Sequence, residues 1–283
     1  MYIAIILLGI TGAIAALILF FISKRFKVEE DPRITQILDI LPGANCGGCG
    51  YPGCGGFASE CVATESLDNL ICPVGGNDVM KNIAAILGKD MNESTPIVAV
   101  VRCNGTCEVR ARTNIYDGAK NCTIASSLYS GETGCSFGCL GFGDCVNACE
   151  FDAIHINLTT GLAEVKEEKC TACGACAKAC PKSIIEMRKK GPKSRRIFVS
   201  CINKDKGGVA RKVCKNACIG CNKCVKECAF EAITVTDNIA YIDDTKCRLC
   251  RKCVAVCPTG AIHELNFPPR KEAENSQLKT PIE

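Results

Sequence analysis

Two stretches near the end of the chain share one pattern of cysteines. CIGCNKCVKECAFEAI occupies residues 218–233, and CRLCRKCVAVCPTGAI occupies residues 247–262. Each places four cysteines at the spacing C-x2-C-x2-C-x3-C and ends in Ala-Ile. Cysteines two residues apart crowd their sulfurs around one point, which suits a metal centre better than a disulfide to a distant strand. The pattern therefore predicts a chain that folds around metal centres.

Two further quartets precede these, and their leading member is stretched to C-x3-C-x5-C-x3-C. In the bacterial ferredoxin pattern, three close thiolates bind one 4Fe–4S cluster and the fourth cysteine binds its neighbour. The pattern predicts four sites, held by Cys135, Cys139, Cys145 and Cys180; by Cys149, Cys170, Cys173 and Cys176; by Cys218, Cys221, Cys224 and Cys257; and by Cys228, Cys247, Cys250 and Cys253. Tandem zinc sites are the alternative, although zinc sites usually pair two distant C-x2-C knuckles.

A separate cysteine group lies nearer the N-terminus, in NCGGCGYPGC and ICPVGG. Its spacing is C-x2-C-x4-C-x17-C, from Cys46, Cys49, Cys54 and Cys72. The glycines let the backbone wrap closely around a bulky cluster and turn N–H groups toward its sulfurs. We expect a fifth 4Fe–4S cluster here, with a zinc knuckle as the alternative. Cys61 is expected to be a buried structural thiol, because free cysteine packs as a small hydrophobe.

Five cysteines remain outside these groups: Cys103, Cys107, Cys122, Cys201 and Cys214. The runs PIVAVVRC and RIFVSC both have the apolar character of strands and both end in cysteine. They suggest one small α/β unit into which the first ferredoxin module is inserted. Strands in one sheet would bring Cys103 and Cys201 to the same edge. Our hypothesis is a sixth cluster held by Cys103, Cys107, Cys122 and either Cys201 or Cys214; the alternative is that these cysteines only pack in a small domain.

The first 25 residues have the character of a membrane anchor. Residues 2–22 form a run without charge, and this run is long enough to cross a bilayer as a helix. The positive residues Lys24, Arg25 and Lys27 follow this run, so the positive-inside rule places the rest of the chain in the cytoplasm. A cleaved signal peptide, the alternative, would need positive charge before the run. We expect a single-pass protein of the cytoplasmic membrane.

Composition limits the function of the remainder. The chain has 283 residues with 26 cysteines, a formal charge of +4 and no Trp. Thiolate-bound clusters need a reducing compartment, and five or six dianionic clusters would turn the net charge negative. No motif for covalent haem, a dinucleotide or a nucleoside triphosphate is present, and no basic aromatic surface points to nucleic acid. We therefore expect an electron-transfer protein without a catalytic site of its own.

These parts combine into an α+β fold built from several small units. It has an N-terminal transmembrane helix, a small 4Fe–4S domain and two 2[4Fe–4S] ferredoxin-like modules, one of them inserted in the small α/β unit. The expected boundaries are 1–23 for the anchor, 24–92 for the N-terminal 4Fe–4S domain, 93–134 and 194–214 for the two parts of the α/β unit, 135–193 and 215–265 for the ferredoxin-like modules, and 266–283 for a disordered tail.

The order of these parts resembles the B component of the Rnf complex. The most specific pieces are CGGCGYPGC with CPVGG, and GCLGFGDCVNACEFDAI. The two-module form is similar to the clostridial and acetogen type. The resemblance implies a ferredoxin:NAD oxidoreductase that translocates Na⁺ or H⁺, in which this component takes electrons from reduced ferredoxin and passes them to the other Rnf subunits in the membrane. The alternatives are an iron–sulfur subunit of a hydrogenase or formate dehydrogenase, and a zinc-rich interaction protein.

Overall fold

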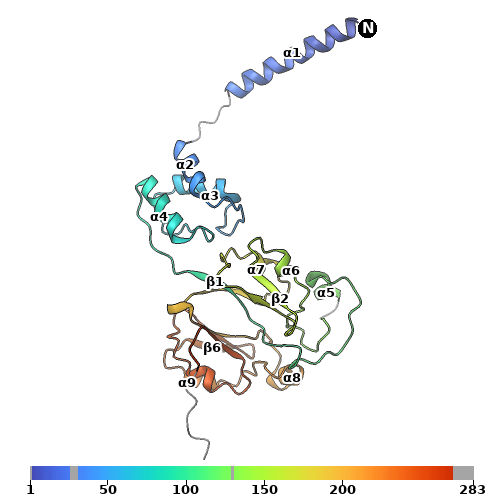
Figure 1. The fold of residues 1–283 in the computed structure, drawn as a ribbon, viewed down its shortest axis with the longest axis vertical. Coiled ribbons are helices and arrows are strands. Elements are labelled where there is room, and N and C mark those ends of the chain that lie inside the picture. The colour runs from blue at the N-terminus through green and yellow to red at the C-terminus, as the bar shows by residue number, and fades with distance from the viewer. Residues whose placement is uncertain (1, 26–30, 129–130, 270–283) are drawn as a thin grey trace, which may run out of the picture.

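The computed structural model describes residues 2–25, 31–128 and 131–269. Its helices are α1 (Tyr2–Arg25), α2 (Pro32–Ile40), α3 (Gly53–Ala63), α4 (Gly76–Leu87), α5 (Cys122–Leu128), α6 (Asp144–Asn147), α7 (Ala175–Ala179), α8 (Gly207–Val213), α9 (Lys223–Glu227) and α10 (Lys252–Ala255). Its strands are β1 (Ile97–Val101), β2 (Ile154–Asn157), β3 (Leu162–Val165), β4 (Ile185–Lys189), β5 (Arg196–Val199), β6 (Ile233–Thr236), β7 (Ile239–Ile242) and β8 (Ile262–Leu265). Figure 1 shows the helical N-terminal domain, the β2 region and the β6 region following one another along the longest axis.

Helix α1 covers the stretch that the sequence predicts as a membrane anchor, and it stands apart from the other elements (Figure 1). Apolar side chains along it are open to solvent, with Leu17 58% and Phe21 65% exposed. Within the described part of the chain, no helix combines the length and the apolar character that a membrane span requires. The anchor therefore stays a prediction from the sequence.

Helices α2, α3 and α4 form the N-terminal domain around one apolar core. Ile37, Phe57 and Ile83 from the three helices are almost completely buried in it. Asp31 caps α2 by accepting a hydrogen bond from the backbone N–H of Arg33. Cys61 is 0% exposed and belongs to this core, as predicted. Three short helices thus form a rigid base beside the cysteine loop.

The remaining strands form two modules of the same design. In each, an inner antiparallel hairpin joins consecutive strands, β2 with β3 and β6 with β7. In each, the first strand also pairs with the last, β1 with β4 and β5 with β8. The strands expected in GLAEVKEEK and NIAYIDDTK are β3 and β7, and the Ala-Ile pieces lead into β2, β6 and β8.

The predicted small α/β unit does not exist as a separate sheet. β1 and β5 are the opening strands of the two ferredoxin-like modules, and no pairing between them occurs in the described strands. The physical reason is that each module ends in a strand whose backbone groups need a partner, and the apolar run before the module supplies it. The chain still brings the ends of β1 and β5 together, because the Asn104 N–H donates to the Ser200 carbonyl at 3.1 Å.

The C-terminal tail begins later than predicted. Asn266 donates hydrogen bonds to Glu167 and to the Ser194 carbonyl, and the Phe267 ring lies under the guanidinium of Arg251, with 5.0 Å between Arg251 Cζ and the ring centroid. The first residues of the expected tail therefore close the second module. The rest of the predicted disordered segment, 270–283, lies outside the described residues.

Candidate iron–sulfur sites

The cysteines gather into six groups of four. Five groups each line one cavity: Cys46, Cys49, Cys54 and Cys72; Cys149, Cys170, Cys173 and Cys176; Cys122, Cys139, Cys145 and Cys180; Cys103, Cys135, Cys201 and Cys214; and Cys218, Cys221, Cys224 and Cys257. The sixth group is Cys228, Cys247, Cys250 and Cys253, in which burial and then the neighbouring thiols raise the pKa of Cys247 and Cys253. Cys61 and Cys107 belong to none of these groups.

The donor set and its surroundings fit a 4Fe–4S cluster. Burial, and then the neighbouring thiols, raise the pKa of Cys145 and Cys253 to about 12 and that of Cys176 and Cys224 to about 11. Thiols in such a setting lose their protons only if positive charge is bound between them. A cluster that offers one iron atom to each thiolate supplies that charge. Among the described residues, no three His, Cys, Asp or Glu side chains are arranged to hold a single metal ion.

The N-terminal site is built on the loop between α2 and α3. Glycines permit its tight turns, with Gly47 and Gly50 at φ of 64° and 89°. The Asn45 side chain accepts a hydrogen bond from the backbone N–H of Cys54 at 2.8 Å, which fixes the first turn of α3. The Gly75 N–H points at the Cys72 sulfur from 3.3 Å. These contacts hold all four cysteines around one cavity, as the sequence predicts.

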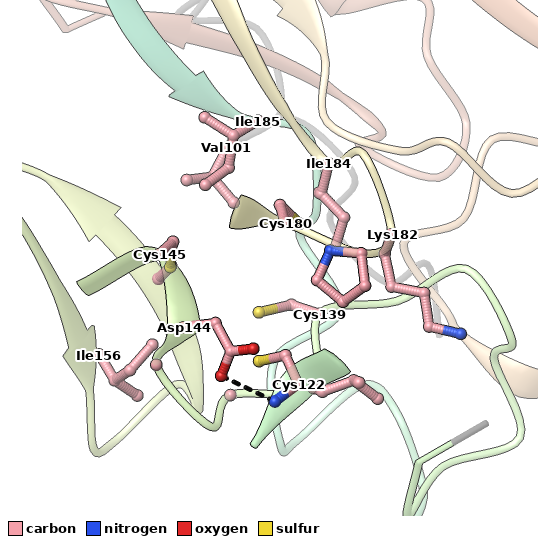
Figure 2. Close-up of a pocket in the computed structure, with 15 residues that line it drawn as sticks. Val101, Cys122, Cys139, Asp144, Cys145, Ile156, Cys180, Lys182, Ile184 and Ile185 are labelled. Atoms are coloured by element: carbon pink, nitrogen blue, oxygen red, sulfur yellow. Dashed lines mark hydrogen bonds between the residues drawn. The ribbon is translucent and has the colours of Figure 1, made fainter. Parts of the chain in front are cut away.

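The structure changes the membership of the stretched quartet. Figure 2 shows Cys139, Cys145 and Cys180 around one cavity with Cys122 as the fourth sulfur. Cys135, which the spacing assigns to this group, lines a different cavity. The predicted grouping is wrong in this one member, because Phe142 stands where the second module has its middle cysteine and Cys122, 17 residues before Cys139, supplies the missing sulfur.

A comparison of the two modules explains why Cys122 takes the place of the middle cysteine. Cys145 and Cys224 are each the second residue of a short helix, α6 and α9, so they occupy equivalent places. The second module has Cys221 three residues before Cys224, and the first module has Phe142 at the equivalent place before Cys145. Asp144 holds Cys122 in this place by accepting hydrogen bonds from the N–H groups of Cys122 and Thr123 at 2.8 and 3.0 Å. Spacing alone does not identify Cys122, although the missing cysteine between Cys139 and Cys145 is a signal that the ligand pattern is broken.

Cys135 belongs to a central site with Cys103, Cys201 and Cys214. Of the cysteines in the sixth-site hypothesis, the structure brings Cys103 together with both Cys201 and Cys214, which the hypothesis gives as alternatives. The hypothesis is wrong about Cys122 and about Cys107, which is exposed and has its sulfur against Gly161. The site gathers at the ends of β1, β5 and α8 because the opening strands of both modules finish side by side.

The exchange of fourth cysteines between paired groups appears in both modules. Cys180 lines the cavity of Cys139 and Cys145, and Cys149 lines the cavity of the Cys170 group. In the second module, Cys257 lines the cavity of the Cys218 group and Cys228 lies with Cys247. Paired sites are therefore adjacent. The Cys224 thiol of one site is close enough to contribute to the raised pKa of Cys253 in the other.

Neighbouring groups also touch across module boundaries. The Cys139 N–H donates to the Cys103 sulfur at 3.5 Å, which joins the first module to the central site. Cys201 of the central site lies next to Cys218. Burial raises the pKa of Cys201 to about 12, and the Cys218 N–H acts in the opposite direction by donating a hydrogen bond to the Cys201 sulfur. A Cβ placed on Gly48 would lie 2.9 Å from the Cys173 backbone, so the N-terminal domain contacts the first module at its cysteine loop. The six groups form an unbroken row.

Comparison with known proteins gives the same assignment of parts. A 4Fe-4S dicluster domain family matches residues 135–185, another matches residues 217–261, and a putative Fe-S cluster family matches residues 41–70. The B component of the Na(+)-translocating ferredoxin:NAD(+) oxidoreductase complex of Acetobacterium woodii is 44% identical over 256 residues, 90% of this chain and 75% of the relative.

Two further relatives extend over almost the whole chain. The B component of the ion-translocating oxidoreductase complex of Methanosarcina acetivorans is 40% identical, covering 89% of this chain and 93% of the relative. The B component of the proton-translocating ferredoxin:NAD(+) oxidoreductase complex of Clostridium ljungdahlii is 39% identical, covering 91% and 90%. With identities well above 30% over most of both chains, this protein belongs to the family of Rnf complex B components, the iron–sulfur electron-transfer subunits of an oxidoreductase complex.

Proposed function

We propose that this chain is a relay of six 4Fe–4S sites that links reduced ferredoxin to the membrane subunits of an Rnf complex. The observation that carries the proposal is the unbroken row of cysteine groups. When bound, each cluster supplies a site that takes up and releases one electron. The protein's part is to hold consecutive groups in contact, through the Cys139–Cys103 hydrogen bond and the Gly48–Cys173 contact.

The proposed direction runs from the C-terminal module to the N-terminal domain. The Cys228 and Cys218 groups lie at the far end of the row from α1, where a soluble donor has access; Cys221 and Cys250 are exposed there. The Cys46 group is tied to α1 by 20 residues, 26–45, and an extended chain spans at most about 3.5 Å per residue. The N-terminal domain therefore stays near whatever α1 is embedded in.

The uncharged stretch of α1 is proposed to be the anchor that holds the chain at the membrane. Its exposed apolar side chains need an apolar environment, and Lys24 and Arg25 at its end favour the cytoplasmic face. In the complex, the other Rnf subunits would complete the path from ferredoxin to NAD and couple it to movement of Na⁺ or H⁺. This chain contributes electron transfer to that coupling, and the partner subunits contribute the rest.

Deleting residues 2–25 separates the two proposed roles. The shortened chain should leave the membrane fraction after cell breakage, because its apolar helix is gone. Once purified and reconstituted, it should still lose its brown colour when mixed with reduced ferredoxin. Full-length chain treated in parallel is the control. A shortened chain that stays with the membranes would contradict the anchor, and an iron-loaded chain that reduced ferredoxin does not bleach would contradict the donor.

A further inference from the structure

Arg110 is a buried guanidinium beside the central site. Its side chain lines the cavity of Cys103, Cys135, Cys201 and Cys214, and the residue is 7% exposed. Nη1 donates to the Cys139 carbonyl at 2.7 Å, so the group lies between the central site and the Cys139 site. Nε is buried and has no hydrogen-bond partner in the described part of the chain.

Arg110 differs from the other buried arginines in having no carboxylate. Arg196 is paired with Glu167, and Arg188 lies 3.3 Å from Glu186. No ion pair of Arg110 is found among the described residues. Burying a charge without a partner costs several kcal/mol, so buried charges in proteins are paired. An anion is therefore expected beside Arg110, which lines the cavity of the central cysteines.

The central site also receives several hydrogen bonds to its sulfurs. Asn203, 1% exposed, directs its side-chain Nδ2 toward the Cys135 sulfur at 3.6 Å and its backbone N–H toward the Cys201 sulfur at 3.5 Å. The Cys139 N–H adds a third, to Cys103. Sulfurs of other groups, Cys72, Cys149 and Cys218 among them, also accept such bonds, so hydrogen bonds alone do not distinguish the central site. Positive charge and N–H groups stabilise the more negative, reduced form of a cluster.

We propose that Arg110 is the internal counter-charge of the central site and makes the reduction potential of its cluster less negative. This inference rests on the proposed cluster at Cys103, Cys135, Cys201 and Cys214. Arg102 also lines the cavity, but it has Glu186 at 3.1 Å, a carboxylate that it shares with Arg188, whereas Arg110 has no carboxylate among the described residues. Electrons that pass between the two ferredoxin modules cross this site, so Arg110 tunes the step that joins them.

Redox titration of the full-length chain, followed by electron paramagnetic resonance, tests this role. Cys214→Ala identifies the signal of the central cluster by its loss. Arg110→Gln should then lower the midpoint potential of that signal by about 59 mV or more, a tenfold change for a one-electron couple. Arg112→Gln is the matched control, because Arg112 is 74% exposed and its loss removes the same charge from the surface. Its potentials should equal those of the unchanged chain.

Arg110→Lys guards against a simple packing effect. It keeps the charge, so it should leave the potential closer to that of the unchanged chain than Arg110→Gln does. If Arg110→Gln loses the central cluster, its retention in Arg110→Lys supports the counter-charge role, and its loss from both contradicts that role. An unshifted potential in Arg110→Gln overturns the inference while leaving the six sites intact. If Cys214→Ala removes neither iron nor signal, the proposed central cluster itself is wrong.

Discussion

Replacing Cys54 with Ala in the assembled complex should stop electron delivery to the membrane subunits. Cys54 lines the cavity of the N-terminal site, the last group in the row before α1. The contact between Gly48 and Cys173 is the junction that joins this site to the ferredoxin modules. Without the N-terminal cluster, the path ends at the Cys173 group. Reduced ferredoxin should still bleach the clusters of both modules, because their cysteines are unchanged.

Cys61→Ala is the matched control for this experiment. Cys61 lies in the same domain, is completely buried and lines no cysteine cavity. Its replacement should cost about 1 kcal/mol of stability through a small void and should leave electron delivery in place. The measurement is the rate at which reduced ferredoxin drives reduction of the membrane partners. A normal rate in the Cys54→Ala complex would show that electrons leave by another site.

Paired cysteine replacements should separate the two sites that the structure regroups. Cys122→Ala and Cys135→Ala should each remove about four iron atoms per chain, since each breaks one cluster. The double variants are more telling. Cys122→Ala with Cys139→Ala should remove the same four, because both cysteines line one cavity. Cys135→Ala with Cys139→Ala should remove about eight, because these two line different cavities and each cluster holds four iron atoms.

The alternative grouping gives the opposite result. If Cys135 and Cys139 bound the same cluster, the double variant Cys135→Ala with Cys139→Ala would lose only about four iron atoms. Cys107→Ala should leave the iron content unchanged, because Cys107 is exposed and lines none of the cysteine cavities. Iron analysis of anaerobically reconstituted protein, with the spectra of the remaining clusters, distinguishes the two arrangements.

Local spacing was sufficient to predict the regular sites. C-x2-C-x2-C confines three sulfurs to one loop, so the grouping of the Cys170, Cys218 and Cys247 sets follows from neighbouring residues alone. The short strands after Cys149 and Cys228 were also predictable from alternating apolar residues. The Ala-Ile pieces lead from a cysteine loop into a strand: β2 and β6 open the two hairpins, and β8 pairs with β5.

Contacts between distant segments were beyond the reach of spacing. β1 and β5 were expected in one sheet, yet each pairs with the last strand of its own module, which lies far downstream in the sequence. Cys122 reaches its site through the bonds of Asp144 to the first turn of α5. Arg110 has no sequence signature at all, since its role follows from burial and the absence of a carboxylate among the described residues. Such features depend on tertiary packing.

Iron and zinc content of the anaerobically reconstituted full-length chain tests the central claim most directly. Six cysteine groups predict about 24 iron atoms per chain, four for each cluster, with little zinc. About 20 iron atoms, at four for each cluster, would contradict the sixth site at Cys103, Cys135, Cys201 and Cys214. A value of about eight iron atoms, enough for only two clusters, together with stoichiometric zinc would contradict the relay as a whole.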